Sequence, residues 1–294
     1  MRQPLFEHRL ELAGRTTRAL ELEGEGPPLV LAHGYADSAD TWRLVLERCA
    51  QAGRRAIAID LPGYGEADRL NGGPVLPQYD AVVGELVERV AHEAGEPVVL
   101  AGNSLGGVVA LRLGAVPGLP LLGIAPIAPA GLEMPRWFSA IERDVVLRTV
   151  LASRVPMPAA LVRLIVGQVY RQLAFSRPRE APGELVSMFT SHHPSVAAVH
   201  HVLAMGRRLL PELQSPPPLA AIRVPVLLVW GDRDRMVTHA GARLVLDAVP
   251  GTDHVVLASC GHCPQLEAPD ALAELLLGFQ QSAAVAAGRV AAGH

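Results

Sequence analysis

Short apolar runs alternate with longer amphipathic segments along most of this chain. Residues 29–34, 54–60 and 97–103 are mainly apolar runs that end close to a glycine, a proline or a serine, whereas residues 41–53 and 79–95 carry apolar side chains at helical spacing. Short strands that alternate with helices form mostly parallel sheets covered by helices on both faces. The sequence therefore predicts an α/β fold, and 294 residues, half of them hydrophobic, are enough for one large core.

The remaining elements of the predicted core follow the same rules. Residues 5–13 and 16–23 alternate apolar and polar side chains around Gly14, which predicts a hairpin. Further strands are predicted over 121–129, 224–232 and 253–259, and further helices over 104–115, 239–249 and 268–282. The last residues are rich in alanine and glycine, so we expect them to form a flexible tail.

The alternation stops at Gly131. The following residues contain helical apolar patterns, such as 160–173, and prolines that divide them, but no convincing strand. A stiff Ser-Pro-Pro-Pro connector at 215–218 precedes the next strand. The expected organisation is an α/β core over 1–131, a helical cap over 132–215, the rest of the core over 216–283 and the tail over 284–294.

Charge and residue usage exclude several functions. The formal net charge of −3 gives no support for binding nucleic acid or an anionic membrane. All 26 basic residues are arginines, so no lysine is available for a Schiff base. Three cysteines do not make a disulfide scaffold, and the single C-x-x-C at Cys260 and Cys263 is a weak signal for zinc. We expect a structural or incidental role for these thiols.

The sequence also sets expectations for location and partners. No uncharged apolar stretch reaches the roughly 18 residues of a membrane span, and the first residues lack the layout of a signal peptide. We therefore expect a cytoplasmic protein with a small-molecule substrate, no nucleic-acid partner and no membrane span. The sequence is compatible with a monomer or a homo-oligomer. The histidine pairs at 192–193 and 200–201 have no acidic or cysteine neighbour that completes a ligand set, so we expect no metal and no cofactor.

One serine interrupts two apolar segments within residues 98–113. Ser104 stands between Gly102 and Gly106, where a predicted strand turns into a predicted helix. A strained strand-to-helix turn projects a serine hydroxyl beyond the sheet, and side chains two residues before and after it would collide. The helix behind the serine also points its positive end at developing negative charge. The alternatives are an ordinary glycine-rich turn or a phosphate-binding turn, but the G-x-G-x-x-G and Gly-Lys-Ser/Thr residues of nucleotide sites are absent.

Five motifs in order make the chain resemble the α/β-hydrolase superfamily, in its serine-nucleophile branch with a cap. They are His33-Gly34, Asp60-Leu-Pro-Gly-Tyr-Gly65, Gly102-Asn-Ser104-Leu-Gly-Gly107, Trp230-Gly-Asp-Arg-Asp234 and Gly261-His262-Cys-Pro-Gln-Leu-Glu-Ala-Pro269. The resemblance implies a mostly parallel twisted sheet flanked by helices, with a helical cap inserted after the sixth strand. Only the cap carries no motif.

The resemblance also implies a Ser-Asp-His triad, because the triad of this family runs in the order nucleophile, acid, histidine. Ser104 would be the nucleophile and His262 the general base. Asp234 would orient the histidine, and Asp232 is the alternative acid.

Backbone N–H groups of Tyr35 and Leu105 would form the oxyanion hole of such a site. We call the strand-to-helix turn at Ser104 the elbow, and the loop that begins at His33 the oxyanion loop. The residues expected to support these two segments are His33, Gly34, Gly102, Gly106 and Gly107. We expect His33 to be a structural hydrogen-bonding group and not a second base. Substrate contacts are expected from Asn103, Trp137 and Phe138.

A serine at the elbow argues against the epoxide-hydrolase and dehalogenase branches, which use aspartate there. The resemblance therefore implies a serine esterase that cleaves a carboxylic ester, or a thioester, of a small to medium apolar acyl or aryl group through an acyl-enzyme. Carbon–carbon hydrolysis of a vinylogous diketone is the second interpretation, since Arg235 fits that branch but residues 33–42 lack its glycine-rich stretch. A cofactor-free perhydrolase, an acyltransferase and a non-catalytic binding protein are further alternatives.

Overall fold

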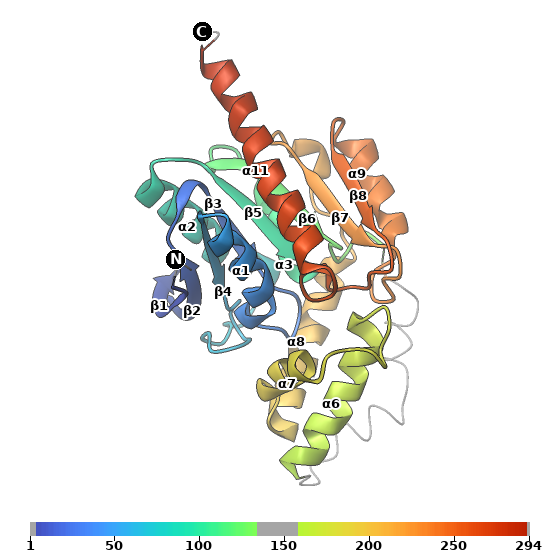
Figure 1. Cartoon of the computed structure of the whole chain (residues 1–294). Coiled ribbons are helices and arrows are strands. Elements are labelled where there is room, and N and C mark those ends of the chain that lie inside the picture. The colour runs from blue at the N-terminus through green and yellow to red at the C-terminus, as the bar shows by residue number, and fades with distance from the viewer. Residues whose placement is uncertain (1–3, 134–157, 293–294) are drawn as a thin grey trace.

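A computed structural model describes residues 4–133 and 158–292 of the chain. In this part, eight strands form one twisted sheet in the order β1-β2-β4-β3-β5-β6-β7-β8 (Figure 1). The strands are β1 (Phe6–Leu12), β2 (Arg15–Leu22), β3 (Glu25–Ala32), β4 (Arg54–Ile59), β5 (Val98–Asn103), β6 (Leu121–Ile127), β7 (Leu227–Gly231) and β8 (Asp253–Leu257). Only β2 runs antiparallel to its neighbours β1 and β4. The predicted mostly parallel sheet is confirmed.

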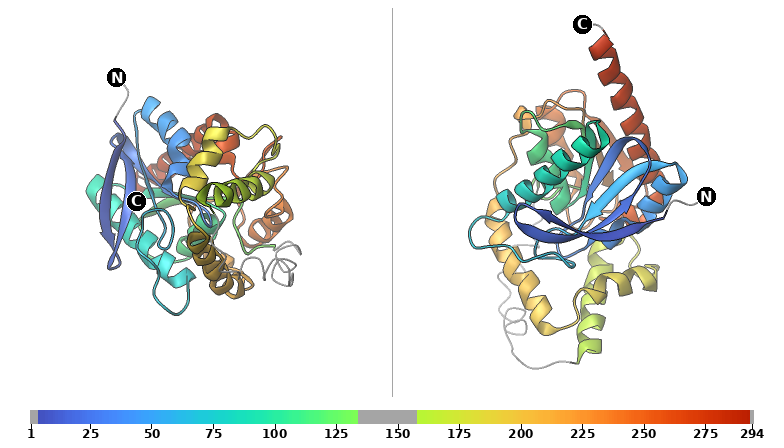
Figure 2. Two further views of the ribbon diagram at one scale, coloured as in Figure 1. Left: turned by 90° about the horizontal axis from the view of Figure 1, so that it is seen from below. Right: turned by 90° about the vertical axis from the view of Figure 1, so that its left-hand side faces the viewer.

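Helices cover both faces of this sheet (Figures 1 and 2). One face carries α1 (Arg43–Gln51) and α11 (Pro269–Ala292), and the other carries α2 (Leu76–Ala94), α3 (Leu105–Gly114) and α9 (Ala242–Ala248). The short helices are η1 (Ala39–Trp42), η2 (Leu219–Ala221), η3 (His239–Gly241) and α10 (Pro264–Glu267). Each face of the sheet therefore has an apolar cluster of its own.

The central strands are mainly apolar along their length because both of their faces are buried. In β5, Val98 and Leu100 belong to the cluster under α2 and α3, whereas Val99 and Ala101 belong to the cluster under α1 and α11. Burying a side chain the size of valine or leucine contributes about 1.5–3 kcal/mol. This two-sided burial explains why the strands of the sequence are continuous hydrophobic runs.

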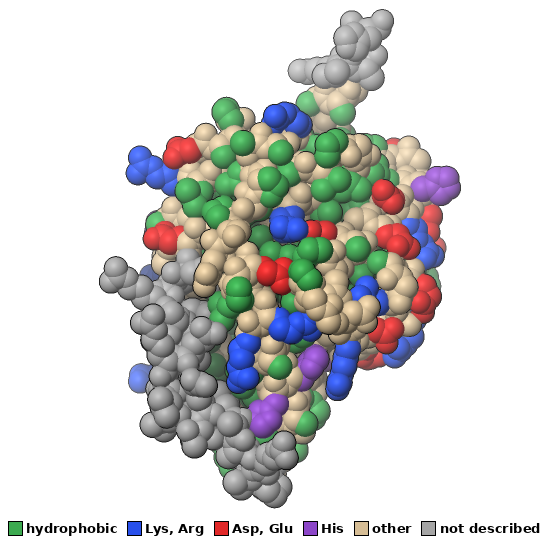
Figure 3. All heavy atoms as spheres, turned by 180° about the vertical axis from the view of Figure 1, so that it is seen from behind, with side chains coloured by type: hydrophobic (Ala, Val, Ile, Leu, Met, Phe, Trp, Pro, Cys, Tyr) green, Lys and Arg blue, Asp and Glu red, His purple; other side chains and the backbone are tan. Residues whose placement is uncertain are grey.

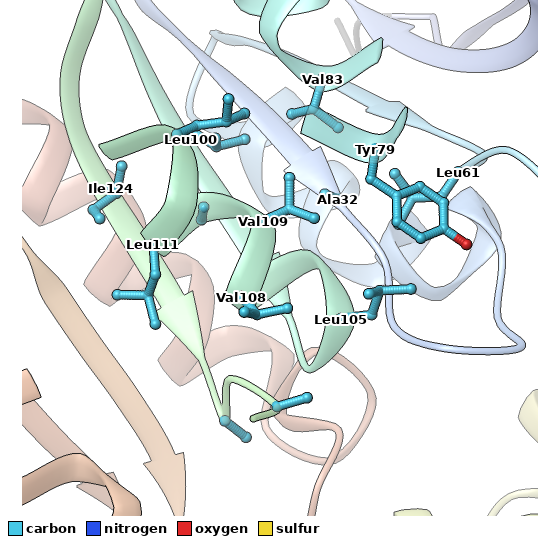
Figure 4. Close-up of a cluster of buried hydrophobic side chains, with 14 of the residues drawn as sticks. Ala32, Leu61, Tyr79, Val83, Leu100, Leu105, Val108, Val109, Leu111 and Ile124 are labelled. Atoms are coloured by element: carbon cyan, nitrogen blue, oxygen red, sulfur yellow. The ribbon is translucent and has the colours of Figure 1, made fainter. Parts of the chain in front are cut away.

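Helix α3 is buried on nearly every side, since it lies between the sheet and α2. Leu105, Val108 and Leu111 are all at most 2% exposed. Figure 4 shows these side chains spaced along the helix, and they belong to the same apolar cluster as Leu100 of β5. Contacts on all sides fix the first turn of this helix, and that turn directly follows Ser104.

The cap helices that lie within the described residues are inserted between β6 and β7, at the position predicted for an insertion after the sixth strand. They are α6 (Ala159–Ala174), α7 (Gly183–Ser191) and α8 (Val196–Leu213), which lie below the sheet in Figure 1. The rings of Tyr170 and Phe189 stack with their centroids 3.7 Å apart and join α6 to α7. Trp137 and Phe138, the predicted substrate contacts of the cap, lie outside the described residues.

The described part of the cap is cationic. Residues 158–215 include six arginines and three glutamates, whereas the formal net charge of the whole chain is −3. Figure 3 shows arginine and histidine side chains gathered over the lower part of one face, where the cap lies.

The last helix is longer than the sequence analysis predicts. Helix α11 continues past the expected end at residue 282 to Ala292, so the described part of the predicted tail over 284–294 is helical. Alanine has the highest helix propensity, and no proline interrupts this segment. Figure 2 shows the last turns projecting away from the sheet. None of the helices in the described ranges is both long and apolar enough to cross a bilayer.

A buried network of charged groups joins the cap to the core. Arg18 Nη2 lies 2.7 Å from Asp40 Oδ2, and Arg18 Nε lies 2.9 Å from Asp60 Oδ2. From the cap, His192 Nε2 lies 3.2 Å from Asp40 Oδ2 and 3.0 Å from Ser38 Oγ. The hydrogen bond to Asp40 raises the pKa of His192 above its ordinary value, although burial opposes this shift.

We predict that His192 stabilises the fold most at low pH. A pKa raised by folding stabilises the folded state fully below the ordinary histidine pKa of about 6.5, and this contribution is lost as pH rises through the folded-state pKa. His192→Gln should lower the free energy of unfolding by about 1–2 kcal/mol near pH 5.5 and by much less near pH 9, measured by urea unfolding. The exposed His239, changed to Gln, is the matched control and should show no such trend. An equal loss at both pH values would contradict the charge-based contact.

Candidate active site

Ser104 stands at the junction of β5 and α3 in a strained backbone conformation. Its φ of 53° and ψ of −104° lie in a region that non-glycine residues rarely adopt. A Cβ on Gly102 would lie 2.2 Å from the carbonyl oxygen of Gly106. A Cβ on Gly106 would in turn lie 2.2 Å from the carbonyl oxygen of Ala32. Only glycine fits at these two positions, which accounts for the Gly-x-Ser-x-Gly spacing.

Two further predicted supports lie against the same turn. A Cβ on Gly34 would lie 3.4 Å from Ser104 Cβ and 3.3 Å from Asn103 Oδ1. A Cβ on Gly107 would lie 3.0 Å from the carbonyl oxygen of Gly102. Side chains at either position would therefore crowd the elbow.

Asp234 and His262 form a buried pair. Their side chains are 1% and 4% exposed, and Asp234 Oδ2 lies 2.7 Å from His262 Nδ1. The other carboxylate oxygen accepts hydrogen bonds from the N–H groups of Met236 (2.7 Å) and Val237 (3.0 Å). Nδ1 of His262 donates to the carboxylate, and the buried Nε2 on the other side of the ring has no hydrogen-bond partner in the described part of the chain.

Asp232, the alternative acid, makes a different contact. Its Oδ1 accepts a hydrogen bond from the Cys260 N–H at 3.1 Å, and the residue is exposed. Backbone N–H donors, that of Ser259 foremost, hold the pKa of this carboxyl below its ordinary value. Asp232 therefore joins the loops after β7 and β8, whereas Asp234 is the carboxylate that contacts His262.

Asn103, predicted as a substrate contact, forms hydrogen bonds within the protein. Its side-chain amide donates to the His262 carbonyl oxygen at 2.9 Å and accepts from Gln265 Nε2 at 3.2 Å, and the residue is 1% exposed. A buried amide needs hydrogen-bond partners on both sides, and these lie inside the protein. Asn103 thus joins the elbow to the loop that carries His262, which we call the histidine loop.

His33 fixes one peptide of the oxyanion loop. Its Nε2 accepts a hydrogen bond from the Leu61 N–H at 2.8 Å, so Nδ1 carries the ring proton and donates to the Gly34 carbonyl oxygen at 2.7 Å. Burial lowers the pKa of His33 to about 4, which keeps the ring neutral at pH 7. In a trans peptide the N–H points opposite to the carbonyl, so this contact turns the Tyr35 N–H away from His33.

The two predicted oxyanion donors lie at one pocket. Tyr35 and Leu105 line it together with Ser104, and within the described residues neither backbone N–H group has an acceptor. The remaining walls come from Ala130, Met236, Val237 and from Gly206, Leu209, Leu210 and Leu213 of α8. The described lining contains no charged side chain, so the pocket suits an apolar group.

Glu267 is a site residue that the sequence analysis does not identify. Its Oε1 accepts a hydrogen bond from the Gly261 N–H at 2.7 Å, and its Oε2 accepts one from the Ser176 N–H at 2.8 Å. The His262 N–H also donates to the carbonyl oxygen of Ala174, at the end of α6. The cap is therefore fastened to the histidine loop. In the sequence, Glu267 stands between Pro264 and Pro269 in the last of the five motifs, whereas its partner Ser176 in the cap belongs to no motif.

The thiols take no part in this arrangement. Cys49, Cys260 and Cys263 are buried and free. Burial raises the pKa of Cys260 to about 12, which keeps its thiol protonated. Within residues 4–133 and 158–292, no cluster of three or more histidine, cysteine, aspartate or glutamate side chains has the geometry of a metal site.

Comparison with known proteins identifies relatives of this chain. A family model described as the alpha/beta hydrolase family matches residues 29–275. The dihydrolipoyllysine-residue acetyltransferase component of the acetoin cleaving system of Pseudomonas putida is 28% identical over 276 residues, which cover 92% of this chain and 68% of that protein. The pimeloyl-[acyl-carrier protein] methyl ester esterase of Yersinia pseudotuberculosis is 28% identical over 266 residues, which cover 88% of this chain and 95% of the esterase.

A solved structure is similar over nearly the whole chain. It is a membrane phospholipase A, described as a bacterial virulence factor, with a TM-score of 0.77 and 25% identity. The match covers 95% of this chain and 86% of the phospholipase chain.

We predict that Glu267→Gln destabilises the fold. Glutamine keeps the shape of the side chain, but its NH2 group would face one of two backbone N–H groups and leave that donor without an acceptor. The loss should be about 1–3 kcal/mol in the free energy of unfolding, measured by urea titration. Glu274→Gln on the exposed side of α11 is the matched control and should change this value by less than about 0.5 kcal/mol. Equal stability of the two variants would contradict the fastening role.

Proposed function

The chain belongs to the alpha/beta hydrolase family, and we propose that it is a serine hydrolase that cleaves a carboxylic ester, or a thioester, of a small to medium apolar acyl or aryl group. The observation that carries this proposal is the buried Asp234–His262 pair, with a 2.7 Å contact on Nδ1 and an unpartnered Nε2 in the described part. A further support is that Asn103, which directly precedes Ser104, donates a hydrogen bond to the His262 carbonyl oxygen at 2.9 Å.

In the proposed reaction, Ser104 Oγ attacks the ester carbonyl carbon while His262 Nε2 takes the hydroxyl proton. Asp234 holds the proton on Nδ1 and stabilises the imidazolium that forms. The carbon–oxygen bond to the alcohol then breaks, and the alcohol leaves with the proton from His262. Water attacks the acyl-enzyme in the same way, with His262 again as the base, and releases the acid and free Ser104.

The backbone N–H groups of Tyr35 and Leu105 are the proposed donors to the oxyanion. Both line the pocket at Ser104 and have no acceptor among the described residues. The amino end of α3 adds a positive partial charge at the same place. By analogy with measured cases, one such donor contributes about 10²–10³ in rate.

The substrate class follows from the pocket and is supported by the relatives. The described lining is apolar, and a charged acyl group buried there would lose its hydration without gaining a partner. One relative in the comparison is named as a methyl ester esterase. We therefore favour a neutral acyl or aryl ester over the other reactions that a serine nucleophile supports.

The proposal predicts that hydrolysis of p-nitrophenyl butyrate and octanoate depends on Ser104. Ser104→Ala removes the nucleophile, and by analogy with serine proteases kcat should fall on the order of 10⁶-fold, which is below detection. Ser187→Ala, on the exposed side of α7, is the matched control and should keep wild-type kinetics. Circular dichroism of each variant establishes that it is folded.

Each other outcome of this assay has a definite meaning. Full activity of Ser104→Ala would overturn the assignment of the nucleophile. If the wild type cleaves no ester but cleaves a vinylogous diketone with loss of activity in Ser104→Ala, the enzyme is a carbon–carbon hydrolase. If a fluorophosphonate fails to label Ser104 in the wild type, the chain is a binding protein of this fold.

A second prediction separates the two candidate acids. Asp234→Asn keeps the shape of the side chain but favours the wrong imidazole tautomer, so kcat should fall by about 10⁴. Asp232→Asn changes an exposed residue of the same loop and should alter kcat/KM by about twofold or less. A larger loss in Asp232→Asn than in Asp234→Asn would exchange their roles.

A further inference from the structure

Tyr35 connects the pocket to the cap. Its backbone N–H group is a proposed oxyanion donor, while its side-chain hydroxyl donates a hydrogen bond to the carbonyl oxygen of Val202 in α8. The ring packs edge-on against Tyr64, with centroids 5.7 Å apart and an interplanar angle of 70°. One residue thus contacts the cap through its side chain and the pocket through its backbone.

Gly206 makes this contact possible. It lies one turn after Val202 in α8, and a Cβ at this position would lie 2.6 Å from the Tyr35 hydroxyl oxygen. Glycine inside a helix is less stable than alanine by about 0.8–1 kcal/mol. The helix therefore contains an unfavourable residue at the one point where the Tyr35 hydroxyl approaches its backbone.

The same loop meets the cap at a second residue. The Ala36 carbonyl oxygen accepts a hydrogen bond from His193 Nε2 at 2.8 Å. Ala36 has a φ of 62°, which a residue with a side chain rarely adopts. A contact with the cap therefore stabilises the strained residue that directly follows Tyr35.

We propose that Tyr35 is a positioning residue through which α8 holds the oxyanion loop, so that the oxyanion hole is formed only while α8 of the cap contacts this loop. The inference rests on the proposed function, because it assigns a task to the Tyr35 N–H. His33 fixes the Gly34–Tyr35 peptide from the core through the Gly34 carbonyl. The bond from the Tyr35 side chain to Val202 fixes the other end of this peptide from the cap.

The proposal predicts a specific kinetic change. An oxyanion donor acts mainly in the transition state, so its misalignment lowers kcat and leaves KM nearly unchanged. Tyr35→Phe keeps the ring and the backbone N–H but removes the bond to Val202. Gly206→Ala keeps the hydroxyl but forces it away from α8. Both should lower kcat by about ten- to hundredfold, which is less than the full value of one donor.

The experiment compares these variants with two matched controls. Thr252→Val removes a hydroxyl that also donates to a backbone carbonyl, that of Val249 at 2.7 Å, but lies between α9 and β8, and Gly278→Ala adds a methyl group to α11 where nothing lies within 4 Å. We would measure kcat and KM on p-nitrophenyl butyrate per fluorophosphonate-titrated site. The rate of fluorophosphonate labelling of Ser104 gives a second reading that does not depend on the ester chosen.

Hydrogen exchange of residues 33–40 and of α8 gives a third reading that needs no turnover. We expect Tyr35→Phe and Gly206→Ala to increase exchange in both segments and the controls to leave it unchanged. Wild-type kcat, labelling rate and loop exchange in Tyr35→Phe would overturn the inference. A lower melting temperature with unchanged kcat per titrated site would also overturn it, since Tyr35 would then only fasten the cap. Failure of the wild type to label at Ser104 would instead count against the proposed function, and the exchange data would still test the contact between loop and cap.

Discussion

The strained backbone of Ser104 is the constraint on which the candidate site depends. A non-glycine residue with a φ of 53° costs on the order of 1–3 kcal/mol and persists only where its surroundings determine it. Here β5 lies in the middle of the sheet and α3 is buried on nearly every side. Each buried leucine or valine contributes about 1.5–3 kcal/mol, so one or two side chains of α3 offset the strain. The core thus stabilises a turn that the local sequence would not adopt by itself.

The parallel sheet explains why residues far apart in the chain meet at this turn. The loops after β3, β5, β7 and β8 carry His33, Ser104, Asp234 and His262, and the carboxyl ends of parallel strands lie at one edge of a sheet. Buried hydrogen bonds then set the finer geometry. The Asn103 amide joins the elbow to the histidine loop, because a buried amide is stable only with partners for its donor and its acceptor.

The described cap contributes apolar side chains of α8 to the pocket, and it contacts the loops of the site through its backbone. At one side, Glu267 and His262 bind the backbone at the end of α6. At the other side, Tyr35 binds the backbone of α8. Both halves of the candidate site, the histidine loop and the oxyanion loop, therefore touch the cap. Since breaking a hydrogen bond to a buried group costs about 1–3 kcal/mol, the position of the cap and the geometry of the pocket depend on each other.

The sequence by itself determines the class of fold and the candidates for the site. The periodicity of the hydrophobic residues distinguishes buried strands from amphipathic helices. The order of the motifs makes Ser104, Asp234 and His262 the candidates for the site. Only the tertiary structure decides that Asn103 faces the protein interior. It also decides the contacts of Glu267 with Ser176 and of Tyr35 with Val202. The first pair is separated by 91 positions in the chain, and the second pair by 167. Local propensity and period encode neither contact, because both depend on how distant segments pack in space.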